Sequence, residues 1–284
     1  MHRTSEPLTF RRLLTVACLC FVSLALWLAP VAPADAVAAA KTGQELTAEE
    51  LSHLEDLSRR AFSATNAGSY DQAEAYLTEM IEKLPENPAI WSNLGNVKVS
   101  QNKISEAIAD YNKAIELAPY APDPYLNRGT ALERLERWEE AIADYNQVLE
   151  IDPEDAAAYN NRGNAKAGLQ QWEAALADYQ KATELAPQYS FARANYALAL
   201  YQLGETDASI RTMRSLLRKY PKFADVRAAL TAALWEKGRR GEAESNWVSA
   251  VGLDPRYKDI EWVAQVRRWP PAMVSALDRF LNIE

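Results

Sequence analysis

The sequence predicts an all-α fold, a right-handed superhelical solenoid of antiparallel helix hairpins. Three observations support this prediction. The composition, 48% apolar and 25% charged, is that of a folded chain. Small and bulky residues alternate at fixed distances along the chain. Above all, prolines recur every 34 residues, a period typical of helical repeats, at Pro85, Pro119, Pro153, Pro187, Pro221 and Pro255.

The proline period also gives the register of the repeats. Counting back 31 residues from each proline places repeat starts near residues 54, 88, 122, 156, 190 and 224. Position 8 of each repeat is then small, and position 24 is bulky in every repeat. A small residue at position 8 indicates that the two helices of a hairpin approach closely there, and small residues facing bulky ones indicate that the side chains of one repeat fill the gaps beside the next. Position 8 reads Ala61, Gly95, Gly129, Gly163, Ala197 and Thr231, and position 24 reads Leu77, Tyr111, Tyr145, Tyr179, Met213 and Trp247.

These motifs resemble those of the tetratricopeptide-repeat family over residues 54–255. The second to fourth repeats are close to the family pattern. The fifth and sixth depart from it with Arg193 and Arg227 at position 4, where the earlier repeats carry bulky residues. The resemblance implies that the first helix of each hairpin lines a concave groove. Its positions 2, 5, 6, 9, 12 and 13, here called the groove positions, point into that groove.

The two ends of the repeat array carry their own signals. Thr47 and Glu50 form a capping box that predicts a helix over residues 48–66. At the other end, residues 256–284 predict capping helices: one over 259–268, then one opened by Pro270 and Pro271 and ending near Leu281. We expect their apolar residues to cover the exposed end of the stack. These residues are Trp262, Val263, Val266, Met273, Leu277, Phe280 and Leu281.

The first 36 residues read as a signal peptide. Arg3, Arg11 and Arg12 precede an apolar run, which ends in the small-residue motif Ala34-Asp35-Ala36. Residues 37–46 read as a linker. The alternative is an uncleaved membrane anchor through residues 13–29. Either reading places the rest of the chain outside the cytoplasm, in a periplasm or a thylakoid lumen. The adjacent arginines leave export by the general or the twin-arginine route open.

The segment over residues 259–271, DIEWVAQVRRWPP, resembles the end of a family of repeat proteins from cyanobacteria and the chloroplast lumen. This resemblance implies a periplasmic or thylakoid-lumen protein of a photosynthetic organism.

Asparagines recur at the groove positions. An amide donates and accepts at once, so such a ladder can hold a peptide backbone without reading its sequence. The ladder is similar to one in the repeat domain of O-linked N-acetylglucosamine transferases. The alternative is that these are ordinary solvent-facing residues. In the fifth repeat, aromatic residues occupy groove positions. We expect them to contact either a bound partner or the C-terminal capping helices. The predicted groove residues are Asn93, Asn96, Asn127, Asn160, Asn161, Asn164, Asn195, Phe191 and Tyr201.

Several functions find no support in the sequence. The only cysteines are Cys18 and Cys20, and His53 is the only histidine beyond His2, so we predict no catalytic site, metal or cofactor. The net charge of −8 argues against nucleic acid as a partner. The groove positions also lack the lysine and arginine pattern with which family members clamp the carboxylate of a chaperone tail.

We therefore expect an exported scaffold, not an enzyme, that binds a protein or peptide in its groove and assists the assembly of a complex. Contact with a membrane is expected only through the possible N-terminal anchor. Two alternatives remain open at this point. One is a module that self-associates through an apolar end near Trp235 and Phe280. The other, more remote, is an enzyme of unrecognised type.

Overall fold

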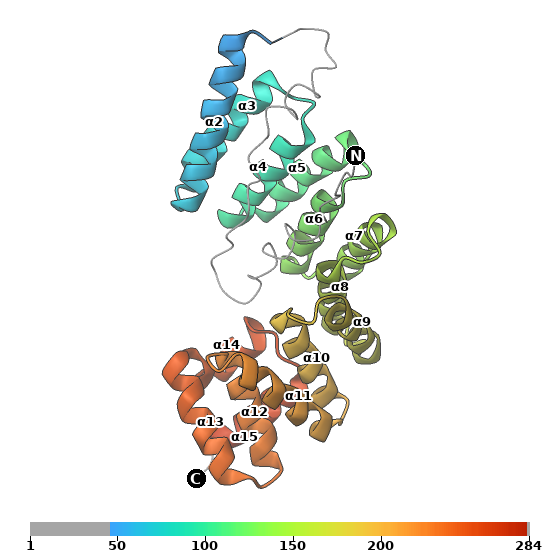
Figure 1. The fold of residues 1–284 in the computed structure, drawn as a ribbon, viewed down its shortest axis with the longest axis vertical. Helices are drawn as coiled ribbons and strands as arrows, with labels where there is room; N and C mark the ends of the chain where they lie inside the picture. The colour runs from blue at the N-terminus through green and yellow to red at the C-terminus, as the bar shows by residue number, and fades with distance from the viewer. Residues whose placement is uncertain (1–45, 283–284) are drawn as a thin grey trace, which may run out of the picture. The chain divides into compact units, whose positions relative to one another are not determined.

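A computed structural model describes residues 46–282 of the chain, and the predicted leader and most of the linker lie outside the described residues. The described part contains helices and no β-strand, which confirms the predicted all-α solenoid of hairpins. The helices form two compact units, one ending at Pro153 and the other beginning at Glu154 (Figure 1).

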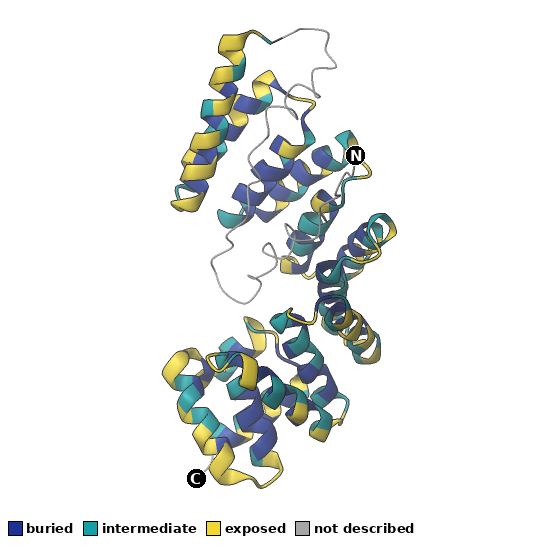
Figure 2. Cartoon of the chain, in the orientation of Figure 1, coloured by how far each residue is buried: buried dark blue, intermediate teal, exposed yellow. Residues whose placement is uncertain are grey.

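The first unit contains three hairpins. In each of them, two antiparallel helices pack along one another, and buried residues line the side on which they meet (Figure 2). Its helices are α2 (Ala48–Asn66), α3 (Tyr70–Lys83), α4 (Pro88–Ser100), α5 (Ile104–Leu117), α6 (Pro122–Arg134) and α7 (Trp138–Ile151).

The second unit contains three more hairpins and a C-terminal segment. The helices of the hairpins are α8 (Ala156–Gly168), α9 (Trp172–Leu185), α10 (Ser190–Gln202), α11 (Thr206–Lys219), α12 (Ala224–Glu236) and α13 (Arg240–Leu253). The C-terminal segment contains the short 3-10 helix η2 (Pro255–Lys258), α14 (Ile260–Gln265) and α15 (Pro271–Leu281).

The predicted capping box at the start of α2 is present. The Glu50 backbone N–H donates to the Thr47 hydroxyl at 3.2 Å, and the Thr47 backbone N–H donates to the Glu50 carboxylate at 2.9 Å. The reciprocal bonds satisfy two N–H groups that would otherwise have no partner. The pKa of Glu50 lies below its ordinary value because its carboxylate accepts from both the backbone N–H and the hydroxyl of Thr47, and both bonds favour the ionised form.

The turn inside each hairpin places position 15 of the repeat in the left-handed conformation. Three of these residues are glycines, with φ between 70° and 83°, and three are Asn102, Glu136 and Gln170, with φ between 58° and 64°. Left-handed backbone costs a residue with a side chain about 1–2 kcal/mol. The same turn geometry is therefore imposed on all six hairpins by the packing of their helices, whether or not glycine is present.

Candidate functional site: the groove positions of the first helices

Each central hairpin is closed by a tyrosine of the second helix that packs on a glycine of the first. A β-carbon added to Gly95 would lie 2.6 Å from Tyr111 Cε1, and one added to Gly163 would lie 2.7 Å from Tyr179 Cε1. These distances are shorter than real side chains allow, so only glycine fits. The two helices approach closely at position 8, as expected, and the bulky residue that packs there is position 24 of the same hairpin, not a residue of the next repeat.

The tyrosine hydroxyls then bind the residue at groove position 9. Tyr111 donates to Asn96 Oδ1 at 2.7 Å, and Tyr179 donates to Asn164 Oδ1 at 3.0 Å. Burial raises the pKa of Tyr111, so its hydroxyl stays protonated and remains a donor. Asn96 and Asn164 were predicted to hold a ligand. In the structure, their carbonyl oxygens hold the hairpin together.

Arginines at position 7 of the first helix form ion pairs with the second helix of the same hairpin. Arg128 reaches Asp144 with two nitrogens, at 2.9 and 2.6 Å, and Arg162 reaches Asp178 in the same way, at 2.9 and 2.7 Å. The aspartates are buried and the arginines partly so. Planar two-bond contacts of this kind fix the geometry of both partners. Both guanidinium groups are therefore already bound to the chain itself, and Arg128 also donates to Asn112 of α5 at 2.6 Å.

The ladder asparagines of the first unit are Asn93 on α4 and Asn127 on α6. Asn93 is 8% exposed, and Asn127 is half-buried. Ligand contact by these two residues stays a prediction, but Asn127 is the more accessible of the two.

The four asparagines of the second unit bind one another. Asn160 donates to Asn161 Oδ1 at 3.1 Å, and Asn195 Nδ2 donates both to Asn160 Oδ1 at 3.0 Å and to Asn164 Oδ1 at 3.1 Å. Asn160 and Asn161 are each 3% exposed. This amide network connects α8 to α10, and it uses part of the hydrogen-bonding capacity that a peptide would need.

The groove positions of the fifth and sixth repeats are covered by the chain itself. Helix α15 packs against α12 and α10. The Ala272 backbone N–H donates to Gln202 Oε1 at 2.8 Å, and Arg279 donates to Glu236 at 2.9 Å. The Phe280 ring meets the Trp235 ring edge to face at 5.4 Å. Gln202 and Glu236 occupy groove position 13 of their repeats, and Trp235 occupies position 12.

The C-terminal segment differs from the capping helices that the sequence predicts. The helix expected over 259–268 is only α14, which ends at Gln265, and Arg268 then takes a left-handed φ of 52°. Val266 was expected to cover the end of the stack, but it is 60% exposed. Helix α15 therefore lies along the groove positions of α10 and α12, with Phe280 also touching Trp247 of α13.

A single carboxylate oxygen anchors the C-terminal segment. Asp225 Oδ1, at groove position 2 of the sixth repeat, accepts from the Tyr257 hydroxyl at 2.7 Å and from Trp269 Nε1 at 2.9 Å. It also accepts from Arg267 at 2.6 and 3.0 Å. The side chains of Arg267 and Asp225 are 5% and 7% exposed. This buried, multiply bonded ion pair fixes where the segment turns back over α12.

Phe191 and Tyr201 were predicted to line a ligand groove, with contact to the cap as the alternative. Tyr201 packs against the core cluster that includes Leu277 and Phe280 of α15. Phe191 meets the Phe223 ring edge to face at 5.4 Å. Both rings therefore contact the second unit's own side chains. The apolar residues Trp235 and Phe280 likewise contact one another.

The sequence did not single out Gln202, Glu236 or Asp225 as contact residues. Each of them occupies a groove position, and the sixth repeat has no asparagine at these positions. The carboxylates of Asp225 and Glu236 there, which match the arginines of the C-terminal segment, were the available signal.

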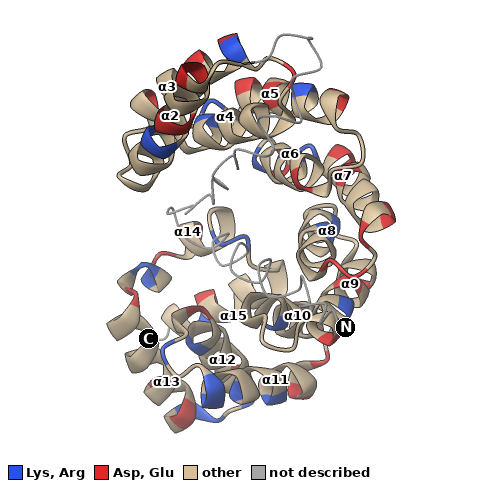
Figure 3. Ribbon diagram, turned by 45° about the horizontal axis from the view of Figure 1, so that its top comes forward, with Lys and Arg blue, Asp and Glu red and all other residues tan. Residues whose placement is uncertain are grey.

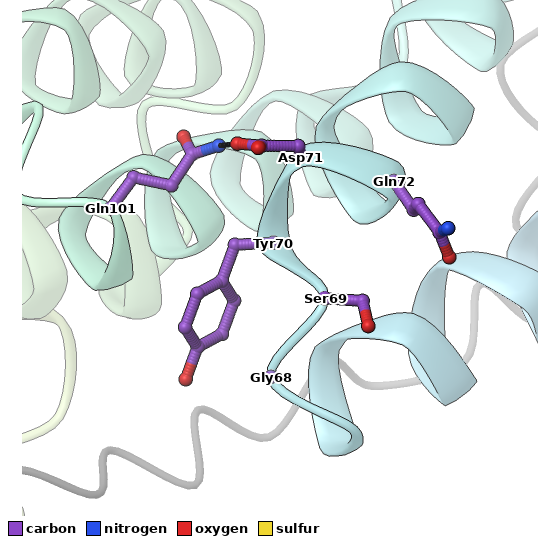
Figure 4. A pocket seen from close by; sticks show the side chains of 6 residues that line it. All are labelled: Gly68, Ser69, Tyr70, Asp71, Gln72 and Gln101. Carbon is purple, nitrogen blue, oxygen red and sulfur yellow. Dashed lines mark hydrogen bonds between the residues drawn. The ribbon is translucent and has the colours of Figure 1, made fainter.

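A shallow hollow lies at the turn between α2 and α3, lined by Gly68, Ser69, Tyr70, Asp71, Gln72 and Gln101, and the Gln101 side chain meets Asp71 beside it (Figure 4). Gln101 Nε2 donates to Asp71 at 2.8 Å and to Glu74 at 2.8 Å. These bonds join neighbouring hairpins and give the hollow a structural role. Within residues 46–282 no cluster of His, Cys, Asp or Glu could hold a metal ion.

Family models of the tetratricopeptide repeat match residues 64–109, 95–136, 134–170, 156–189 and 195–222. Together these matches cover more than half of the 284 residues. The chain is a tetratricopeptide-repeat protein. No protein with curated function matches the sequence significantly.

Solved structures share the fold of this tetratricopeptide-repeat protein. A repeat protein from Parabacteroides merdae is 21% identical, with a TM-score of 0.60 over 82% of this chain and 100% of that one. YrrB, a repeat protein described as having an unusual peptide-binding site, is 24% identical, with a TM-score of 0.51 over 68% and 97% of the two chains. MamA from Desulfovibrio magneticus is 19% identical, with a TM-score of 0.54 over 58% and 94%.

Proteins built from tetratricopeptide repeats are typically scaffolds that bind other proteins, since the stacked first helices present an extended surface. No helix within residues 46–282 of this repeat protein has the length and apolar character needed to cross a membrane. The predicted signal peptide or anchor lies before the described residues.

Proposed function

We propose that this tetratricopeptide-repeat protein is an exported scaffold that binds an extended polypeptide at the groove positions of its earlier repeats. Binding there would assist the assembly of a protein complex in a periplasm or a thylakoid lumen. One observation carries the proposal. The Ala272 backbone N–H donates to the side-chain amide of Gln202, so an amide at a groove position of this chain already holds a polypeptide backbone.

The structure of the second unit limits which repeats can bind a partner. The groove positions of α10 and α12 are covered by α15, whose residues Met273 and Leu277 are fully buried. Displacing α15 would expose these side chains to water at a cost of about 1.5–3 kcal/mol for each one. Among the described residues of the first unit, no helix is folded back over α6 in this way, and Asn127 there is half-buried, whereas Ser92, Asn93 and Asn96 on α4 are buried. We therefore place the ligand at the groove positions of α6.

Site-specific crosslinking tests this proposal. A photoreactive residue at Asn127 should capture a polypeptide partner in cells that express the full chain. The matched control is the same residue at Glu139, which is exposed on the second helix of the same hairpin. Capture through position 139 but not through position 127 would exclude the groove positions as the binding face.

A second, independent measurement tests the exported location. N-terminal sequencing of the protein recovered from fractionated cells should give a chain that starts at Val37. A chain that keeps residues 1–36 in the membrane fraction would favour the anchor, and one that keeps them in the cytoplasm would contradict export.

A further inference from the structure

Helix α11 differs in charge from the other second helices of the described hairpins. Helices α3, α5, α7 and α9 each carry three or four acidic residues and at most one basic residue. Helix α11 carries four basic residues, Arg211, Arg214, Arg218 and Lys219, and one acidic residue, Asp207. Helix α13 carries two acidic residues and one basic residue. Among the described hairpins, the net charge of the second helix is therefore positive only in the fifth repeat.

The basic residues of α11 continue onto neighbouring turns. Residues 211, 214 and 218 follow one another at spacings of three and four, so they share one face of the helix. Lys222 follows α11, and Lys237 and Arg239 lie in the turn before α13, beside Ile210 in a shallow hollow. We call Arg211, Arg214, Arg218, Lys222, Lys237 and Arg239 the basic ridge. Blue segments gather around α11 and this turn in Figure 3.

Half of the residues of the basic ridge already bind carboxylates of this chain. Arg214 binds the Glu242 carboxylate at 2.6 Å, Arg239 binds the same carboxylate, and Lys237 binds Asp207 at 2.9 Å. Arg211, Arg218 and Lys222 are exposed and form no ion pair with a carboxylate of the described residues. The guanidinium fork matches a carboxylate in two bonds, so arginines favour this kind of partner.

We propose that the basic ridge is a second docking surface, separate from the groove positions, for an acidic helical segment of a partner protein. Carboxylates spaced every three to four residues would meet Arg211, Arg214 and Arg218 in register. The surroundings disfavour a lipid surface. Membrane-binding helices combine basic residues with large apolar ones, whereas none of the large apolar side chains exposed in the described structure belongs to α11 or to the turn before α13.

The different charges of the two units make this surface selective. Residues 46–153 contain 9 basic and 20 acidic residues, whereas residues 154–284 contain 18 and 16. The first unit therefore repels acidic segments, and the ridge is where one can bind. Because exposed charges are screened within about 8 Å at physiological salt, binding should weaken steeply as salt is raised.

The experiment uses the full chain and a labelled helical peptide with glutamate at every third or fourth position. Its control peptide carries glutamine instead. The variant Arg211→Glu, Arg218→Glu, Lys222→Glu changes only exposed residues. The matched variant Lys83→Glu, Lys181→Glu, Lys258→Glu changes the net charge equally at exposed positions outside the ridge.

We expect the glutamate peptide to bind the unmodified chain at least about tenfold more tightly than the ridge variant, a difference of about 1.4 kcal/mol. The matched variant should bind within about twofold of the unmodified chain, because long-range charge alone acts weakly in salt. Equal losses in the two variants would overturn the proposal. So would binding to phosphatidylglycerol vesicles in preference to the peptide. Crosslinking through Asn127 should be unchanged in the ridge variant, which separates this proposal from the groove function.

Discussion

The Tyr145 ring lies so close to Gly129 that a β-carbon at residue 129 would sit 2.7 Å from Tyr145 Cε1. The ring is fully buried between α6 and α7, and its hydroxyl donates to Glu133 at 2.6 Å. The ring therefore cannot move aside without losing a buried hydrogen bond.

This contact predicts the effect of Gly129→Ala. Although alanine favours a helix by about 1 kcal/mol, overpacking at a closed contact costs about 1–3 kcal/mol. We expect a net loss of stability, measured by urea unfolding. Gly252→Ala is the control, because no atom lies within 4 Å of a β-carbon placed there. That variant should be as stable as the unmodified chain or more stable. Stabilisation by Gly129→Ala would contradict the packing described here.

The hydrogen bonds to Asp225 predict that even a conservative substitution of this residue lowers the stability of the protein strongly. Asp225→Asn keeps the shape of the side chain but leaves the buried Arg267 without its counter-charge, which should cost about 3 kcal/mol. Asp207→Asn removes a carboxylate from the more exposed pair with Lys237 and should cost much less than Asp225→Asn. Thermal unfolding followed by tryptophan fluorescence compares the two. Similar small losses in both would mean that Asp225 does not hold the C-terminal segment.

The position of α15 predicts which apolar residues near the chain end matter. Phe280 packs between Trp235 and Trp247, with ring centroids 5.4 and 5.3 Å away, so Phe280→Ala should cost about 3–5 kcal/mol. Val266 is 60% exposed, and Val266→Ala should change stability by less than about 0.5 kcal/mol. The sequence alone treated both as residues of the cap. Equal losses in the two unfolding curves would contradict the observed packing.

The contacts of Glu74 predict that the stability of the first unit depends on pH. Hydrogen bonds from Lys103 and Gln101 lower the pKa of Glu74 below its ordinary 4.5, against the opposing effect of burial. A lowered pKa means that the folded state favours the ionised carboxylate. The resulting stability is present above pH 4.5 and is lost as the pH falls through the lowered value.

Glu74→Gln should therefore lower the free energy of unfolding by about 0.5–1 kcal/mol near neutral pH, since the ion pair with Lys103 is partly exposed. The difference from the unmodified chain should shrink in acid, below the lowered pKa. Glu82→Gln, an exposed change on the same helix, should show neither effect. A deficit of Glu74→Gln that stays constant with pH would contradict the assigned charge state.

The hairpins could be predicted from the sequence because each is determined locally. Gly95 and Tyr111 are sixteen residues apart, and the period repeats their pairing along the chain. The C-terminal segment could not be predicted in the same way. Its position depends on Asp225 meeting Arg267 and Trp269, contacts that join residues 42 and 44 apart and recur nowhere in the period. Likewise, a spacing of 34 placed the asparagines in register but could not show that Asn195 bonds to Asn160 and Asn164.

The folded-back position of α15 limits how the array can be lengthened. A further hairpin joined after Leu253 would have to replace the segment that Asp225 and Glu236 hold on α12. The junction between α5 and α6, by contrast, lies between two hairpins with the same glycine and tyrosine pairing. Engineers who wish to extend this protein should therefore insert a copy of residues 88–121 at that junction and leave the chain end untouched.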